Sequence, residues 1–242
     1  MAFENLKTDK AIQDSGDFIG GNYVLESGIY NMLIDLAYMG EAPSSKAMSL
    51  NLVFKGENNV QLKQTIYITS GEAKGLRNYY IDKNGDKQYL PGFNVANALC
   101  QLTLDKEIAS LETEVKVINL YDYTSKKEIP TKVNMLTDLL NQPVTLGVLK
   151  QVVDKNVKND AGDYVPTGDT REINEISKLF RASDRKTLTE IAANADKAEF
   201  IDKWKAKFDG ITVNKAKGSG TPSGASGANV RPDPKPAKSL FA

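Results

Sequence analysis

The residues best suited to bind a ligand gather around one Asn-Gly dipeptide, in the stretch KGLRNYYIDKNGDKQYLPGF at residues 74–93. Asn-Gly favours a two-residue type I′ hairpin turn, because both central residues of that turn need positive φ. Such a turn predicts that Tyr80 faces Tyr89 across the hairpin, on the face that also carries Asp82 and Lys87. This ring pair either forms a platform on which a flat ligand stacks or serves only to stabilise the hairpin.

The same register sorts the remaining hairpin side chains by parity. Residues on the opposite face are expected to enter the core; they are Tyr79, Ile81 and Leu90.

Cations and a further ring adjoin this hairpin in the sequence. In VQLKQTIYIT, at residues 60–69, alternation predicts that Lys63 and Tyr67 point outward from a strand, and Lys74 and Arg77 come just before the hairpin. Exposed rings stack bases without reading sequence, and Lys and Arg contact phosphates, so the combination favours single-stranded nucleic acid. The predicted binding residues are Tyr80, Tyr89, Tyr67, Lys63, Lys74, Arg77, Lys87, Tyr121 and Tyr123.

Two of these residues have a competing interpretation. Tyr121 and Tyr123 share strand parity with Val115 and Val117, so their face could equally belong to the core. The chain also has 31 basic and 31 acidic residues, and this neutral balance weighs mildly against a nucleic-acid binder. A local patch of positive charge would suffice.

The chain contains no histidine, which removes Ser-His-Asp and Cys-His catalysis and His-ligated zinc. It has no Walker A or GxGxxG motif, and its one cysteine, Cys100, forms no intrachain disulfide and is expected to be a buried apolar residue. We expect no cofactor. An acidic group could hold Mg²⁺ as a nuclease would, or could simply be a solvated hairpin tip; it comprises Asp154, Asp160, Asp163, Asp169 and Glu172.

The hydrophobic pattern is mostly that of strands. Two kinds of pattern predict short strands joined by turns. Apolar and polar residues alternate with period 2 at residues 30–38, 48–55 and 60–69. β-branched or aromatic residues are frequent at 113–123 and 145–159, and a return strand follows at 163–168. Residues 91–103 have one apolar side and predict a helix over the end of the sheet. The fold class is therefore mainly β, as a closed or partly closed antiparallel barrel or a sandwich.

Residues 1–217 are expected to form one domain that ends in helices at about 187–209. Thr187 and Glu190 have the spacing of a capping box, and Ile201, Trp204 and Phe208 form one apolar stripe that packs on the barrel or contacts a ligand. Residues 218–242 are rich in Gly, Ser and Pro and are expected to be a disordered tail.

The N-terminal residues lack the basic start and apolar run of a signal peptide, and no stretch approaches the roughly 18 apolar residues of a membrane span. We therefore expect a cytoplasmic protein.

Blocks of the chain resemble bacteriophage single-stranded DNA-binding proteins with an OB-fold core. The matching blocks are residues 74–100, VTLGVLKQVVDKNVKN, TREINEISKLF and AEFIDKWKAKFDG, in that order, and the resemblance covers most of residues 20–215. It implies an OB barrel with extra hairpins that coats single-stranded DNA during phage replication, recombination and repair, in the cytoplasm of the bacterial host, without sequence preference and without catalysis.

The tail departs from that family. Many such proteins end in an acidic tip with a terminal aromatic residue that recruits replication or recombination partners, whereas this tail carries Arg231, Lys235 and Lys238 against Asp233. Phe241 keeps an aromatic residue near the end, but Ala242 follows it. The tail either recruits such a partner, adds loose phosphate contacts or contributes only to solubility. A phage structural or assembly protein with β architecture, whose exposed tyrosines contact proteins, is the alternative function.

Overall fold

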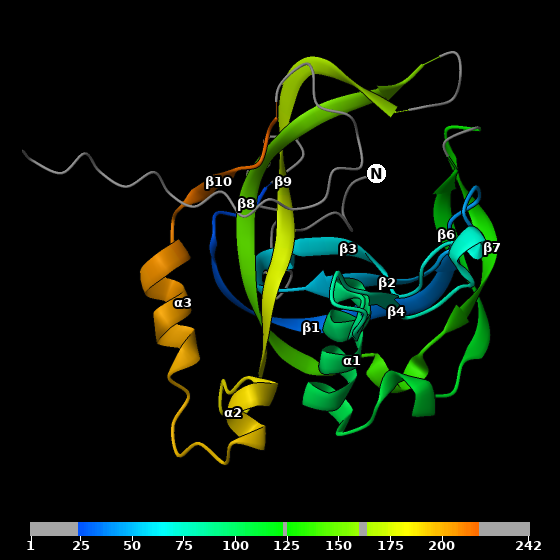
Figure 1. Cartoon of the computed structure of the whole chain (residues 1–242). Coiled ribbons are helices and arrows are strands. Elements are labelled where there is room, and N and C mark those ends of the chain that lie inside the picture. Colours follow the sequence, from blue (N-terminus) through cyan, green and yellow to red (C-terminus); the bar gives the residue numbers. More distant parts are fainter. Residues whose placement is uncertain (1–23, 123–124, 160–163, 218–242) are drawn as a thin grey trace, which may run out of the picture.

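The computed structural model describes residues 24–122, 125–159 and 164–217, and this part of the chain is mainly β (Figure 1). The strands are β1 (Gly28–Glu41), β2 (Met48–Lys55), β3 (Gln61–Tyr67), β4 (Tyr79–Ile81), β5 (Lys87–Tyr89), β6 (Glu114–Asp122), β7 (Lys127–Met135), β8 (Pro143–Lys158), β9 (Tyr164–Arg181) and β10 (Thr212–Asn214). The α-helices are α1 (Pro91–Leu104), α2 (Leu188–Ala192) and α3 (Phe200–Phe208). The predicted tail at 218–242 lies outside the described residues.

The main sheet is built around β1, which pairs antiparallel with β2 along one edge and with β8 and then β7 along the other. β3 continues the sheet from β2, β9 from β8 and β6 from β7, while β10 runs parallel to β8. The β6–β7 and β8–β9 hairpins project beyond the rest of the sheet in Figure 1. β3 and β9 contact each other, but no ladder joins them in the described residues, so a closed barrel is not confirmed.

One continuous core lies between the curved sheet and α1. The predicted inward residues of β2 and β3 are mostly buried, among them Leu50, Phe54 and Leu62. Helix α1 confirms the helix predicted at 91–103 and buries its apolar side, including Ala96 and Leu99, against the sheet.

The alternation predicted for β1 changes parity at a β-bulge between Ile34 and Leu36. Ile34 pairs with Phe54 and is buried, but after the bulge it is Ala37 that is buried, and Leu36 is only half-buried. One extra residue reverses the faces of all residues that follow it. Tyr38 therefore lies on the outer face, opposite Asn51, rather than on the core face.

Sequence patterning missed some strands. It did not identify β7, whose residues KEIPTKVNM include a proline and alternate poorly, or the short β10, and it ended β9 too early. β7 forms because its backbone pairs with that of β6, although the sequence of β7 has no clear strand pattern.

The C-terminal helices form as the capping signal predicts. Thr187 Oγ1 accepts a hydrogen bond from Glu190 N, and the Glu190 carboxylate accepts one from Thr187 N, which completes the capping box of α2. In α3, Ile201 and Trp204 are buried against β8 and β9, so the apolar stripe packs on the sheet. Within the described chain, no helix is both long and apolar enough to cross a membrane.

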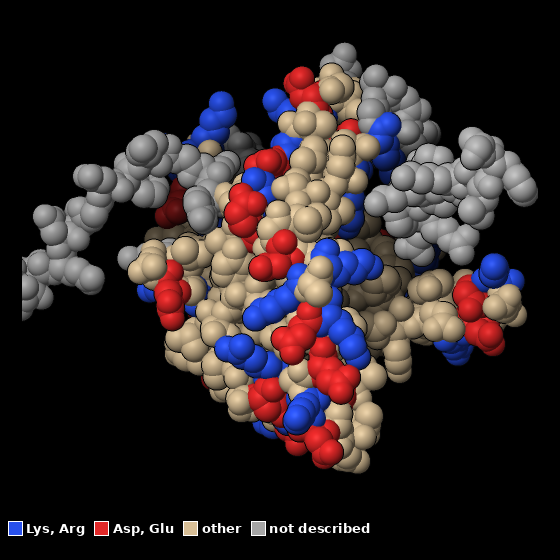
Figure 2. All heavy atoms as spheres, turned by 90° about the vertical axis from the view of Figure 1, so that its left-hand side faces the viewer, with Lys and Arg blue, Asp and Glu red and all other residues tan. Residues whose placement is uncertain are grey.

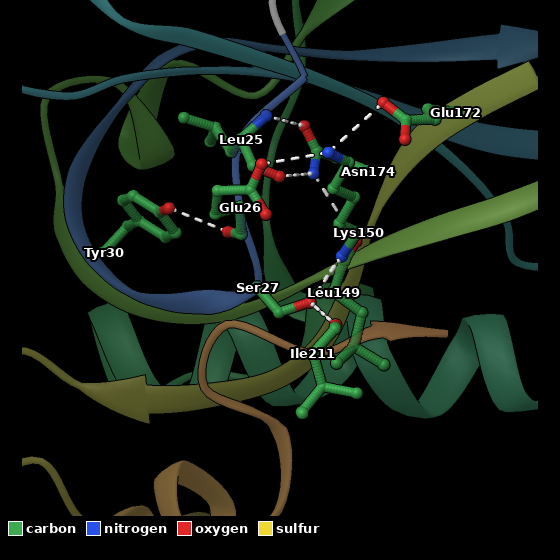
Figure 3. Close-up of polar contacts among 9 residues, drawn as sticks. All are labelled: Leu25, Glu26, Ser27, Tyr30, Leu149, Lys150, Glu172, Asn174 and Ile211. Atoms are coloured by element: carbon green, nitrogen blue, oxygen red, sulfur yellow. Dashed lines mark hydrogen bonds and ion pairs between the residues drawn. The ribbon is translucent and has the colours of Figure 1, made fainter. Parts of the chain in front are cut away.

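Polar contacts attach the first and last described segments to β8 and β9 (Figure 3). Leu25 N donates to Asn174 Oδ1 and Asn174 Nδ2 donates back to Leu25 O, both at 2.8 Å. Ser27 Oγ donates to Ile211 O at 2.6 Å and accepts from Lys150 N at 2.8 Å. Residues 25–27 and 211 are thereby held at the same part of the sheet.

Burial of Cys100 leads to a testable prediction. The side chain is fully buried in α1, and burial raises the pKa of its thiol to about 12. Since only the thiolate reacts with disulfide reagents, we expect no detectable reaction of the folded protein at about pH 8 and complete reaction after unfolding in guanidinium, followed by absorbance of the released thiol. Rapid reaction of the folded protein would contradict this packing of α1.

Candidate nucleic-acid interface

A surface cavity of about 1020 Å³ brings together four of the predicted binding residues, Tyr67, Lys74, Arg77 and Tyr80. They come from the end of β3, from the loop at residues 69–77 and from β4, and the start of α1 completes the wall. We call this hollow the Tyr67–Tyr80 cavity. Consecutive segments of the chain thus converge on one concave surface.

Close backbone contacts shape the wall of this cavity. Glu72 N donates to Ser45 O at 2.7 Å, and a Cβ on Gly71 would lie 3.1 Å from Ser45, so the loop is fastened to the β1–β2 turn. At the start of α1, a Cβ on Gly92 would lie 2.1 Å from Tyr67 O. Only glycine allows α1 to begin against the end of β3 and so to close the cavity.

The hairpin register differs by one residue from the predicted register. Tyr79 pairs with Tyr89 and Ile81 with Lys87, whereas the Asn-Gly turn predicted that Tyr80 faces Tyr89. Asp82 is the cause: its Oδ1 accepts hydrogen bonds from the amides of residues 84 and 86 at 2.9 and 3.0 Å, which lengthens the loop. The same hydrogen bonds lower the pKa of the Asp82 carboxyl below its usual value.

This register places Tyr80 and Tyr89 on opposite faces of the β4–β5 hairpin, so they do not form one platform. Tyr80 is 46% exposed and lines the cavity, while Tyr89 is 59% exposed and its ring lies 5.1 Å from that of Phe93. The predicted core positions also change. Ile81 is 58% exposed, and Tyr79 is half-buried in the cavity wall.

Lys74 and Arg77 carry charges that are available to an anion. Neither forms an ion pair with a carboxylate anywhere in the described residues. Lys150 is the opposite case, because its Nζ lies 2.9 Å from Glu26 and 3.3 Å from Glu172, contacts that also raise its pKa (Figure 3). On the α3 side of the molecule, Figure 2 shows cations and carboxylates interspersed, a distribution that does not favour phosphate.

The remaining predicted residues lie outside the cavity. Lys63 is exposed on the outer face of β3, the face that carries Tyr67, and Lys87 starts β5. Tyr121 is 53% exposed on β6 and does not line the cavity, and Tyr123 lies outside the described residues. Val115 and Val117 are 66% and 61% exposed, so the β6 face that they share with Tyr121 is not core.

The members of the acidic group that the structure describes do not form a metal site. Asp154 Oδ2 accepts a hydrogen bond from Lys217 N and Glu172 pairs with Lys150. Asp160 and Asp163 lie outside the described residues, and within those that are described no three acidic, Cys or His side chains are arranged to hold a metal ion.

Sequence reasoning missed the residues that close the cavity without carrying charge or rings, notably Ser45, Gly71 and Gly92. The glycines were the only available signal. Comparison of the chain with protein-family models, with curated proteins and with solved structures finds no match.

Proposed function

We propose that the protein binds single-stranded DNA without sequence preference and without catalysis. The observation that carries the proposal is the Tyr67–Tyr80 cavity, which is lined by two exposed rings and by two cations that form no ion pair within the described residues. Bases stack on Tyr67 and Tyr80, while Lys74 and Arg77 contact phosphates. Lys63 extends the path along the outer face of β3, and Tyr89, Lys87, Tyr121 and Tyr123 are further candidates.

The proposed architecture is an OB-type barrel with added hairpins. The order β3-β2-β1-β8-β9, with a helix between β3 and β8 and with β3 in contact with β9, supports this proposal. In such barrels the nucleic acid lies across neighbouring strands on one face. The role in phage replication, recombination and repair, within the cytoplasm of a bacterial host, follows from the resemblance of the sequence blocks, as does a replication or recombination partner for the tail.

A titration tests the function. Anisotropy of a labelled oligo-dT should report binding whose affinity falls about 20- to 50-fold between roughly 50 and 200 mM salt, because each cation–phosphate contact on a single strand adds about −0.7 to the salt slope and three or four cations are available. A duplex of the same length should bind more weakly. Absence of binding at low salt, or binding without a salt slope, would contradict the proposal.

The alternative, a structural or assembly protein, is favoured by one observation. The β6–β7 hairpin exposes Val115, Val117 and Ile129, and no other strand pairs with the outer edge of β6 in the described residues. Exposed apolar strands of this kind can pair with another chain. That function predicts concentration-dependent assembly in sedimentation velocity and no response to oligo-dT.

A further inference from the structure

Two cations from different segments approach a single ring in the cavity wall. The guanidinium carbon of Arg77 lies 5.7 Å from the centroid of the Tyr79 ring, and Nζ of Lys87 lies 5.0 Å from the same centroid. Distances below about 6 Å allow an attractive cation–π contact. The ring of Tyr79 therefore already has two cations as partners.

The backbone around Arg77 is fixed on both sides. Arg77 N donates to Ser70 Oγ at 2.9 Å, and Ser70 N donates to Arg77 O at 2.7 Å. The side chain then passes over Gly75, where an added Cβ would lie 3.4 Å from Nε. Gly75 has φ +77°, a conformation that favours glycine, and its lack of a side chain leaves room for the Arg77 side chain to reach Tyr79.

The observed hairpin register is what brings Lys87 to the same ring. Because Tyr79 pairs with Tyr89 and Ile81 with Lys87, Lys87 lies diagonally across from Tyr79 on one face of the hairpin. In the register that the Asn-Gly turn predicts, Lys87 would share a face with Tyr80 instead. The loop hydrogen bonds of Asp82 thus decide which ring Lys87 reaches.

Two like charges beside one ring lack a counter-charge from the protein. Neither Arg77 nor Lys87 forms an ion pair within the described part of the chain, and the Asp82 carboxylate is occupied by backbone amides. Mutual repulsion of the cations is relieved when an anion lies between them. A phosphate of a strand bound in the adjacent cavity is an anion of the right charge and size.

We propose that Tyr79 is a positioning residue, which holds Arg77 and Lys87 together as a clamp for one backbone phosphate and does not itself stack on a base. The inference rests on the proposed single-stranded DNA function. The ring restricts the two long side chains before the phosphate binds, so they lose less conformational entropy on binding. Tyr79 therefore contributes to affinity through the cations.

The test compares Tyr79→Leu with Tyr79→Phe in the oligo-dT titration. Tyr79→Leu should weaken binding about 5- to 30-fold, as the loss of two cation–π contacts implies, and should make the salt slope shallower by about 1. Tyr79→Phe keeps the ring and should bind within about twofold of the unaltered protein. Thermal unfolding of each variant checks that the hairpin change has not unfolded the domain.

A second pair of variants separates positioning from structural support. Arg77→Gln with Lys87→Gln should reproduce the shallower slope, and adding Tyr79→Leu to this pair should cause little further loss. The clamp is overturned if Tyr79→Leu leaves affinity and slope unchanged, if Tyr79→Phe is as harmful as Tyr79→Leu, or if removal of both charges leaves the slope intact. Failure of the unaltered protein to bind oligo-dT would instead overturn the proposed function and the clamp with it.

Discussion

Replacing Tyr67 and Tyr80 together with alanine is expected to weaken binding to oligo-dT by at least about 30-fold, since one stacked base contributes about 1–3 kcal/mol. Both rings line the same cavity, and they are 53% and 46% exposed. Their removal deletes little core packing, so the midpoint of thermal unfolding should stay nearly unchanged. Anisotropy titration and circular dichroism of the same samples measure the two effects.

Tyr89→Ala is the matched control for this double substitution. Tyr89 is at least as exposed, but it lies on the other face of the hairpin and packs on Phe93 at 5.1 Å. A loss below about threefold is expected if bases stack only on the rings of Tyr67 and Tyr80, because Tyr89→Ala then removes no stacked base. If Tyr89→Ala were as harmful as Tyr67→Ala with Tyr80→Ala, bases would also stack outside the cavity, and the assignment of Tyr67 and Tyr80 as the stacking rings would be wrong.

The strands and the helix that enclose the core were predictable because their patterns are local. Leu50, Phe54, Leu62 and Leu99 follow the periods of strand and helix and are buried as those periods predict. Where the structure departs from the pattern, a single residue is responsible. The bulge at residue 35 adds one residue to β1 and reverses the faces beyond it.

The hairpin shows how two valid local signals can conflict. Asn84-Gly85 favours a two-residue turn, but in the observed longer loop the Asp82 carboxylate accepts hydrogen bonds from two backbone amides. The longer loop leaves Gly85 at φ +89°, which glycine accepts readily. Residue types alone did not indicate that the aspartate would prevail, so the tyrosines were identified and their pairing was not.

The cavity could not be predicted from the sequence because its walls come from contacts between distant segments. Gly71 lies against Ser45, and Gly92 lies against Tyr67 O. Neither contact changes the hydrophobic periodicity of the sequence, so neither can be predicted from it. The residue types did predict the chemistry of the site, which combines aromatic rings with cations. Which of those residues meet was decided by the tertiary structure.

Trp204→Ala should cause the largest loss of stability among the substitutions considered, about 3–5 kcal/mol. The indole is 3% exposed and packs with Ile201, Leu149 and Phe180 between α3 and the sheet. The cavity left behind cannot easily collapse, because the strands on that side are held by their ladders. For a chain of this size the midpoint of thermal unfolding should fall by about 6–20 °C, measured by calorimetry.

Two milder substitutions show whether packing or hydrogen bonding accounts for that loss. Trp204 Nε1 donates to Ser177 Oγ at 3.1 Å, and because Ser177 is exposed, water can replace the hydroxyl in Ser177→Ala at a cost of about 1 kcal/mol. Gly147→Ala would place a Cβ 3.0 Å from the indole and should cost about 1–3 kcal/mol through overpacking. Since α3 lies apart from β4 in Figure 1, all three variants should bind oligo-dT normally at temperatures where they are folded. A variant that is folded but binds weakly would mean that the α3 side takes part in the interface, which the interspersed charges there argue against.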